Sequence, residues 1–268
     1  MNVLITGASG GLGRAMAVEC ARRGYHLFLT DINAAALLCI RDGLKRRFGI
    51  EVAAKACDLT DSNSVDEMLQ WIDQNDIRFD MLLNIAGMDF EGGFLSRERE
   101  NIVNIVVLND AATLRITHAV LERRRKNSHF TAVFVSSLAS MFPMPLKATY
   151  AASKRFLFDF AIALRQELKD QDANVLVLCP GGMVTNDEAS AAIAAQGIWG
   201  ILTTNSLEKV AHKTLDKALD GKKCFVPGVL NHALSMFGKI LPRAWIAAVI
   251  YWRWHRAQEK WLNTVNTM

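Results

Sequence analysis

The chain has 268 residues, of which 51% are hydrophobic and 22% charged, and its formal net charge is +4. This balance excludes a disordered chain, and the length suits one large domain better than two. The cysteines are scattered, without CxxC or histidine spacing, so we expect buried reduced thiols and neither a disulfide frame nor a metal site. They are Cys20, Cys39, Cys57, Cys179 and Cys224.

The basic residues do not follow a nucleic-acid-binding pattern. Runs of Lys and Arg precede Gly24, Gly49 and Asn127, where each run closes a helical pattern and the Gly or Asn supplies a left-handed cap. No aromatic residues alternate with these runs, which favours helix ends over contact with nucleic acid. An apolar strand pattern opens the chain with no secretory signal before it, and this predicts a cytoplasmic protein.

Short apolar runs alternate with helical patterns through residue 226. The runs predict strands at 2–6, 26–30, 51–57, 80–87, 131–137, 174–180 and 222–227. Helices are expected to begin near Gly11, Asn33, Asp61, Arg97, Thr149 and Leu207. Strands that are apolar on both faces and separated by helices indicate an α/β fold, a single-domain Rossmann-type doubly wound parallel sheet with helices on both faces.

Two segments depart from this alternation. Residues 182–206 follow the carboxyl end of a strand, where open α/β sheets bind ligands, so they are predicted to form a substrate lid, with an irregular connection as the alternative. Residues 227–268 are expected to add a helical C-terminal extension, in which charges and a proline keep every apolar run short of the roughly 20 residues of a membrane span. Its tryptophans favour packing within the protein or an oligomer over weak membrane association. These are Trp245, Trp252, Trp254 and Trp261.

A glycine-rich turn, TGASGGLG at 6–13, lies between the first strand and the first helix. Gly7, Gly11 and Gly13 would allow a tight turn and let the backbone approach a pyrophosphate at the N-terminus of the helix. The spacing differs from the commoner GxGxxG, and close helix packing is the alternative.

Two aspartates lie at the carboxyl ends of the second and third predicted strands and could contact the cofactor. Asp31 can accept hydrogen bonds from both hydroxyls of an adenosine ribose and would repel a 2′-phosphate, which favours NAD over NADP. The neighbouring Asn33 leaves a turn or cap role open for Asp31. Asp58 is placed to meet the adenine amino group, with a helix-cap role as the alternative.

The combined pattern resembles the short-chain dehydrogenase/reductase family over about the first 226 residues. The motifs are TGASGGLG at 6–13, NIAG at 84–87, Asn109, SS at 136–137, YAASK at 150–154 and PGGMVT at 180–185. The resemblance implies that residues 1–226 are a dinucleotide-binding and catalytic domain whose tetrad is Asn109, Ser137, Tyr150 and Lys154. In that family the asparagine holds a water that relays protons through the lysine, and the proteins are usually homodimers or homotetramers.

The resemblance also implies a cofactor site. Residues 84–87 would stabilise the central strand and flank the cofactor, and residues 180–185 would hold the nicotinamide. The complete predicted cofactor-binding set is Gly7, Ser9, Gly11, Leu12, Gly13, Asp31, Asp58, Leu59, Asn84, Ala86, Gly87, Tyr150, Lys154, Pro180, Gly181 and Thr185.

Physical chemistry supports the tetrad separately. Tyr150 and Lys154 are four residues apart and would share one helix face. A free phenol has a pKa of about 10, and a nearby ammonium is expected to lower the pKa of Tyr150 toward the working range. Ser137 can hydrogen-bond a substrate oxygen as charge develops on it, and Asn109 is disfavoured inside a helix unless its side chain has a task. Singly each residue could serve packing or solvation; together they favour catalysis.

The sequence therefore predicts an NAD-dependent oxidoreductase that interconverts a secondary alcohol and a ketone. An NADP-dependent carbonyl reductase and a catalytically silent dinucleotide-sensing protein on the same fold remain open. Apolar residues in the predicted lid and extension indicate a bulky lipophilic substrate, such as a hydroxysteroid or a 3-oxoacyl chain. They are Met183, Ile193, Ile198, Trp199, Ile201, Phe237, Ile240, Leu241 and Trp245.

Overall fold

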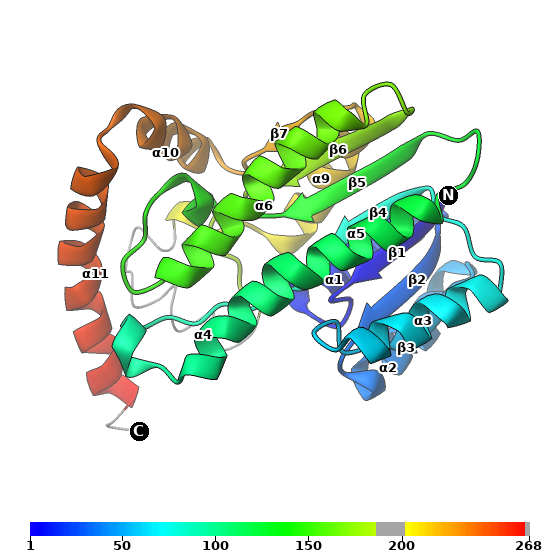
Figure 1. Cartoon of the computed structure of the whole chain (residues 1–268), viewed down its shortest axis with the longest axis horizontal. Coiled ribbons are helices and arrows are strands. Elements are labelled where there is room, and N and C mark those ends of the chain that lie inside the picture. Colours follow the sequence, from blue (N-terminus) through cyan, green and yellow to red (C-terminus); the bar gives the residue numbers. More distant parts are fainter. Residues whose placement is uncertain (186–201, 266–268) are drawn as a thin grey trace.

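The computed structural model describes residues 1–185 and 202–265, apart from the side chains of Phe237, Lys239, Ile240 and residues 255–265. Within these residues a parallel sheet has the strand order β3-β2-β1-β4-β5-β6-β7 (Figure 1). Its strands are β1 (Asn2–Thr6), β2 (His26–Asp31), β3 (Val52–Ala56), β4 (Met81–Asn84), β5 (Phe130–Val135), β6 (Ala173–Leu178) and β7 (Cys224–Phe225). The order reverses between β1 and β4, where doubly wound sheets bind their ligands.

The helices follow the predicted alternation. They are α1 (Gly11–Arg22), α2 (Ala34–Phe48), α3 (Ser62–Gln74), α4 (Arg99–Val106), α5 (Thr113–Glu122), α6 (Ala148–Glu167), α9 (Leu207–Leu219), α10 (Val229–Ile240) and α11 (Arg243–Val265). A π-helical segment, η2 (Val107–Ala112), joins α4 to α5, and two short 3-10 helices are η1 (Phe94–Ser96) and η3 (Leu138–Met141). The predicted fold class is confirmed.

The strands are buried on both faces because helices cover both. In β1, the side chains of Val3 and Ile5 belong to the core beneath α1, α2 and α9. Leu4, which points to the opposite face, belongs to a second core beneath α3, α5 and α6. Alternate residues of each strand thus enter different cores, which explains the continuous apolar runs in the sequence.

Local chemistry fixes where several elements begin and end. The side chain of Asn33 accepts a hydrogen bond from the Ala36 N–H at 3.0 Å and caps α2. Gly24, Gly49 and Asn127 take the expected left-handed conformation, with φ of +74°, +66° and +55°. Asn127 does not cap a helix, however, because α5 already ends at Glu122 and the basic run after it lies in a connection.

The cysteines are free thiols, and their predicted burial is only partly right. Cys20, Cys57 and Cys179 are buried and Cys224 is half-buried. Cys39 is exposed on α2, whose buried face is narrow and includes Leu37 and Leu44.

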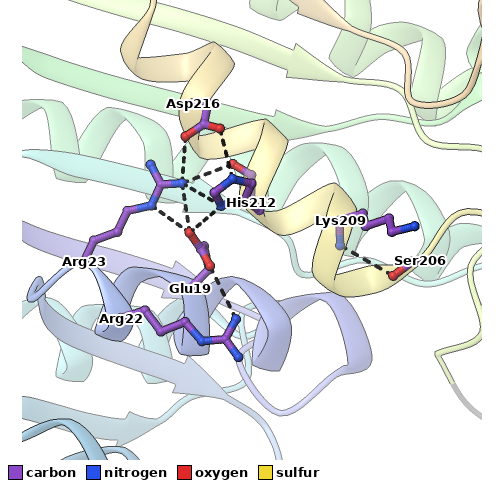
Figure 2. Close-up of polar contacts among 7 residues, drawn as sticks. All are labelled: Glu19, Arg22, Arg23, Ser206, Lys209, His212 and Asp216. Carbon is purple, nitrogen blue, oxygen red and sulfur yellow. Dashed lines mark hydrogen bonds and ion pairs between the residues drawn. The ribbon is translucent and has the colours of Figure 1, made fainter.

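A charged cluster, here called the α1–α9 clamp, joins the first helix to α9 (Figure 2). It consists of Glu19, Arg23, His212 and Asp216. Arg23 donates from Nε to Glu19 Oε1 at 2.9 Å and from Nη2 to Asp216 Oδ1 at 2.8 Å. Nδ1 of His212 lies 2.9 Å from the same Glu19 oxygen. The clamp therefore holds in place the helix that begins at the glycine-rich turn.

The C-terminal extension lies at the end of the molecule toward which the strands point (Figure 1). Ile246 of α11 is buried, whereas Trp245 and Trp252 are 73% and 62% exposed. Among the described residues, none of the helices combines the length and the apolar character that crossing a membrane requires. The extension thus packs partly on the domain and presents the remaining face of α11 to the surroundings.

Candidate active site

The glycine-rich turn has a geometry that side chains would block. Gly7 has a φ of +64°, and a Cβ atom there would lie 2.8 Å from the backbone nitrogen of Ala86. A Cβ atom on Gly13 would lie 2.0 Å from the Gly7 oxygen, and one on Gly11 would lie 2.9 Å from the Cα atom of Thr185. Helix α1 begins here without a side-chain cap, so the backbone N–H groups of its first turn can receive a phosphate.

Asp31 lies at the end of β2, beside this turn. Its Oδ2 accepts a hydrogen bond from the Ser9 N–H at 2.9 Å, and its Oδ1 accepts one from the Asn33 N–H at 3.0 Å. Asp31 therefore has the turn role that was the alternative to ribose binding in the sequence-based prediction. Each oxygen keeps further acceptor capacity, so a ribose contact is compatible with these bonds.

Asp58 and Leu59 follow β3. Asp58 Oδ1 accepts hydrogen bonds from the backbone N–H and the hydroxyl of Thr60, at 2.9 and 2.6 Å. Asp61, and not Asp58, caps α3. The side chain of Leu59 is buried in the core, so only its backbone is placed to meet a ligand.

The segment after β4 is tied to the centre of the sheet. Asn84 Nδ2 donates to Thr117 Oγ1 at 3.0 Å. Oγ1 of Thr6, a residue that the sequence analysis missed, accepts from the N–H groups of Ile85 and Ala86 at 3.0 and 3.2 Å. These bonds fix the backbone that flanks the glycine-rich turn.

Asn109 lies in the π-helical segment and is fully buried. Its Oδ1 accepts from the Met88 N–H at 2.8 Å, and its Nδ2 donates to the Met88 oxygen at 3.1 Å and to Ser153 Oγ at 3.0 Å. A Cβ atom on Gly87 would lie 2.9 Å from Asn109 Oδ1. The side chain thus joins the segment after β4 to α6, and π-helical turns often occur at functional sites.

Ser137, Tyr150 and Lys154 come together at the carboxyl end of β5. Lys154 Nζ donates to the Val135 oxygen at 3.0 Å and lies 5.7 Å from the centroid of the Tyr150 ring. Ser137 forms the N-cap of η3, accepting from the Ala139 N–H at 3.1 Å, and its hydroxyl hydrogen-bonds the phenol of Tyr150. The tetrad residues predicted from the sequence therefore share one site.

The predicted direction of the tyrosine pKa shift is wrong in this structure. Burial raises the pKa of Tyr150 to about 12, and the Asp89 carboxylate acts in the same direction. The Ser137 hydrogen bond and the Lys147 ammonium oppose this rise without outweighing it. The prediction took account of the charge of Lys154 but not of the desolvation of a phenol that the fold leaves half-buried.

Lys147 is a second cation at the tyrosine, and the sequence analysis missed it. Its Nζ forms ion pairs with Asp89 and, at 3.3 Å, with Glu91. The same atom lies 5.7 Å from the centroid of the Tyr150 ring and 5.8 Å from that of Trp254 on α11. Lys147 precedes Tyr150 by three residues, so helical spacing gave the signal that could have identified it.

A pocket of about 500 Å³ opens on Tyr150. Its lining is mainly apolar and comes from the segment before α4, from α4 itself, from residues 146–150 and from α11. The residues include Phe90, Phe94, Leu95, Ile102, Ile105, Leu146 and Tyr251. The extension therefore forms part of the wall, although Leu241 and Trp245, the predicted contributors, are 50% and 73% exposed and do not line it. Met183 packs against the core instead, and the other predicted lining residues lie outside the described part of the chain.

Pro180, Gly181 and Thr185 follow β6. Leu138 N–H donates to the Pro180 oxygen at 2.8 Å, which ties this segment to η3. A Cβ atom on Gly181 would lie 2.3 Å from the Thr203 oxygen, so this position also requires glycine. Most of the predicted lid, from residue 186 to 201, lies outside the described residues.

The fold and this site are those of a dinucleotide-dependent oxidoreductase. A family model for short chain dehydrogenases matches residues 1–195. The chain belongs to the short-chain dehydrogenase family, as its motifs predicted.

Curated relatives share the family and extend beyond the matched region. A very-long-chain 3-oxoacyl-CoA reductase of Neurospora crassa is 33% identical over 180 residues, which cover 64% of this chain and 53% of the relative. A 17-beta-hydroxysteroid dehydrogenase type 3 of Mus musculus is 30% identical over 185 residues, covering 68% of this chain and 60% of that protein. This chain thus spans about half the length of many curated relatives it matches.

Solved structures agree in fold. A short-chain dehydrogenase from Sphingobium yanoikuyae in complex with NADPH has a TM-score of 0.75 and 25% identity, covering 91% of this chain and 97% of that one. A 4-hydroxyisoleucine dehydrogenase complexed with NADH has a TM-score of 0.72 and 19% identity, and the match covers 85% of this chain and 96% of that one. The second likeness concerns the fold alone.

Proposed function

We propose that the protein is an NAD-dependent oxidoreductase that interconverts a ketone and a secondary alcohol on a bulky lipophilic substrate. One observation carries this proposal: Ser137, Tyr150 and Lys154 meet at the carboxyl end of β5, beside an apolar pocket that opens on the tyrosine. A catalytically silent sensor would have no use for this arrangement.

The protein's own residues handle the proton and the charge on the substrate oxygen. When bound, the nicotinamide supplies or accepts the hydride at its C4. Ser137 hydrogen-bonds the substrate oxygen, and Tyr150 exchanges a proton with it. The pKa of Tyr150 is raised to about 12, so the phenol is protonated near neutrality and is in the form that donates a proton. The raised pKa also makes it a weaker acid, so the phenolate that develops during donation needs a nearby cation. The protonated form favours reduction of a ketone, in which the oxygen gains a proton.

The residues present fit a nicotinamide dinucleotide. Cβ atoms on Gly7, Gly11 and Gly13 would obstruct the turn that faces the first N–H groups of α1. Asp31 favours NAD, because its carboxylate can bind ribose hydroxyls and would repel the 2′-phosphate of NADP. Relatives of solved structure hold NADPH or NADH, so the preference of this chain rests on Asp31.

Turnover with the two cofactors tests the NAD preference. We expect a higher kcat/KM with NADH than with NADPH, and Asp31→Ala should bring the two values together. Asp31→Ala also removes the turn bonds to Ser9 and Asn33, so its melting temperature must be measured alongside. A preference for NADPH in the unaltered protein would overturn the NAD assignment and leave the oxidoreductase proposal standing.

The apolar pocket supports the proposed substrate class. Its lining by Phe90, Phe94, Ile105 and Leu146 offers few partners for polyhydroxylated substrates. Relatives named as 3-oxoacyl-CoA reductases and as a hydroxysteroid dehydrogenase are consistent with a lipophilic ketone. The homo-oligomer and the weak membrane contact remain predictions; the exposed Trp245 and Trp252 on α11 support a contact of either kind.

The main experiment is a substrate panel measured by NADH absorbance, with ketosteroids, 3-oxoacyl thioesters and keto sugars as substrates. We expect turnover with steroids or acyl chains. Tyr150→Phe should reduce it by about 10²-fold or more, because the proton donor is lost, while NADH fluorescence shows unchanged binding. Full activity of this variant would remove the mechanism, and turnover of sugars alone would remove the substrate class. NADH binding without turnover across the panel would favour the silent sensor.

A further inference from the structure

Asp110 is a buried carboxylic acid that the mechanism above does not use. It follows Asn109 in the π-helical segment and is only 8% exposed. Its Oδ1 atom is buried and has no hydrogen-bond partner among the residues that the structure describes. A buried carboxylate oxygen without a hydrogen-bond partner costs folding free energy, so stability does not explain the presence of Asp110.

Asp80 shows what a buried aspartate looks like when it serves the fold. It is 4% exposed, and its Oδ2 accepts from the Asn2 N–H at 2.7 Å. Its Oδ1 accepts from Arg125 Nε at 2.9 Å and from Ser128 Oγ at 3.2 Å. Both oxygens of this carboxylate accept hydrogen bonds, one of them from a charged guanidinium, whereas Oδ1 of Asp110 accepts none from the described residues.

The segment that carries Asp110 packs against the helix that carries Lys154: Asn109 Nδ2 donates to Ser153 Oγ at 3.0 Å, and Asp110 and Lys154 are the residues that follow in the two elements. Both side chains are buried, with exposed fractions of 8% and 5%.

The ionisable groups around Lys154 are Asp110 from η2, Asp89 from the segment after β4, Cys179 after β6 and Tyr150 on its own helix. Asp89 is already paired with Lys147. Asp110 is therefore the carboxylate left to compensate the buried ammonium.

The titration behaviour of the two groups agrees with this geometry. Burial lowers the pKa of Lys154 to about 8, and Asp110 is the strongest influence that opposes the shift. Burial raises the pKa of Asp110 to about 7, and Lys154 opposes that shift. Each of the two charges thus makes it less unfavourable for the other group to be ionised in the interior.

We propose that Asp110 is a positioning residue for the reaction: its carboxylate keeps Lys154 in the ammonium form beside Tyr150. This inference rests on the proposed function, because the ammonium matters through the proton exchange at the tyrosine. A neutral Lys154 would no longer help to stabilise a developing phenolate. Asp110 acts through Lys154 and does not itself need to touch the substrate.

Asp110→Asn tests the proposal with little change of shape. Without the negative charge, Lys154 should lose its proton at a lower pH. Carbon-13 NMR of protein labelled at lysine Cε reads this directly, with the Lys154 signal identified by its loss in Lys154→Met. We expect the titration midpoint to fall by about one pH unit, the size typical of a nearby opposite charge. An unchanged midpoint would overturn the proposal.

Turnover and melting provide two further measurements on the same variant. The alkaline limb of the kcat profile should move to lower pH by a similar amount, with little change in KM. Because the pKa of Asp110 is raised in the folded state, the native protein loses stability between about pH 4 and pH 7 as this group ionises. Asp110→Asn should therefore melt at a higher temperature than the unaltered protein above pH 7.

Asp80→Asn is the matched control, since it neutralises an equally buried aspartate. It should lower the melting temperature, because one of the two acceptor oxygens becomes an NH₂ group and the negative charge that pairs with Arg125 is lost. It should leave the Lys154 midpoint in place. If Asp110→Asn behaves in the same way, Asp110 is structural and the proposal is wrong. The NMR and melting measurements need no substrate, so a protein without turnover would overturn the proposed function while these results still judge the Asp110–Lys154 pair.

Discussion

The α1–α9 clamp and the candidate catalytic cluster, which consists of Asp110, Tyr150 and Lys154, are both made of ionisable side chains, yet the surroundings of their charges are opposite. In the clamp, Glu19 and Asp216 each accept hydrogen bonds from Arg23 (Figure 2). In the candidate catalytic cluster, the Lys154 ammonium donates a hydrogen bond to a neutral backbone oxygen. Asp110 Oδ1 has no partner among the described residues.

The pKa directions show what this difference means. Burial works against the charged forms in the clamp, but bonds to His212 and Arg23 outweigh it and lower the pKa of Glu19. In the candidate catalytic cluster burial prevails, so the pKa of Lys154 is lowered and those of Tyr150 and Asp110 are raised. The charges that stabilise the fold have hydrogen-bonding partners of opposite charge. The groups proposed for chemistry are buried with few such partners, at a cost in folding free energy, which is the pattern expected of a functional site.

Lys154→Met should have the largest effect on activity. We expect turnover to fall by about 10²- to 10⁴-fold, the range for loss of acid–base assistance. The melting temperature should stay equal or rise, because a desolvated ammonium is replaced by an apolar chain of similar length, and Asp110, whose pKa burial already raises to about 7, can bind a proton when it loses its partner. Measuring the melting temperature and kcat on the same preparation tests both expectations. A strong loss of stability would show that Lys154 supports the fold and would break the comparison.

Arg23→Met should produce the reverse result in the clamp. Glu19 is 7% exposed and would lose its guanidinium partner, so the free energy of unfolding should drop by about 2 kcal/mol, below the value for a fully buried pair because His212 remains. The value of kcat should not change, since the clamp lies away from the tetrad. Urea denaturation and steady-state kinetics provide the two measurements. A large loss of kcat without a loss of stability would contradict the structural role.

Sequence patterns were sufficient to predict the fold because the patterns that indicate its strands, helices and turns are local. The apolar runs, the caps at Asn33 and Asp61 and the glycine-rich turn each depend on residues a few positions apart. The tetrad was predicted from the family resemblance, whose motifs are also local, and the spacing of Tyr150 and Lys154, one helical turn apart, supported that prediction.

The parts that sequence reasoning missed depend on contacts between distant segments. Asp89 and Asp110 come from two different elements, and only the fold brings Asp89 to Tyr150 and Asp110 to Lys154. Lys147 is the exception, because it lies only three residues before Tyr150. The direction of the Tyr150 pKa shift was wrong for the same reason, because enclosure of a side chain cannot be read from its neighbours in sequence. An acidic residue in the apolar run IVVLNDAA was the available signal for Asp110.

The smallest predicted effect concerns the pH dependence of the clamp and distinguishes it most directly from the candidate catalytic cluster. Because the folded-state pKa of Glu19 is lowered, its charge contributes stability that is present above its ordinary pKa of 4.5 and is lost as the pH falls through the lower folded value. Glu19→Gln should therefore cost about 1 kcal/mol near neutrality, and the difference from the unaltered protein should shrink below pH 4.5. Urea denaturation between pH 7 and pH 3 measures it. Asp110→Asn should show a difference of opposite sign that grows between about pH 4 and pH 7. If both variants changed the free energy of unfolding in the same direction, the two carboxylates would have the same role in stability and the comparison would fail.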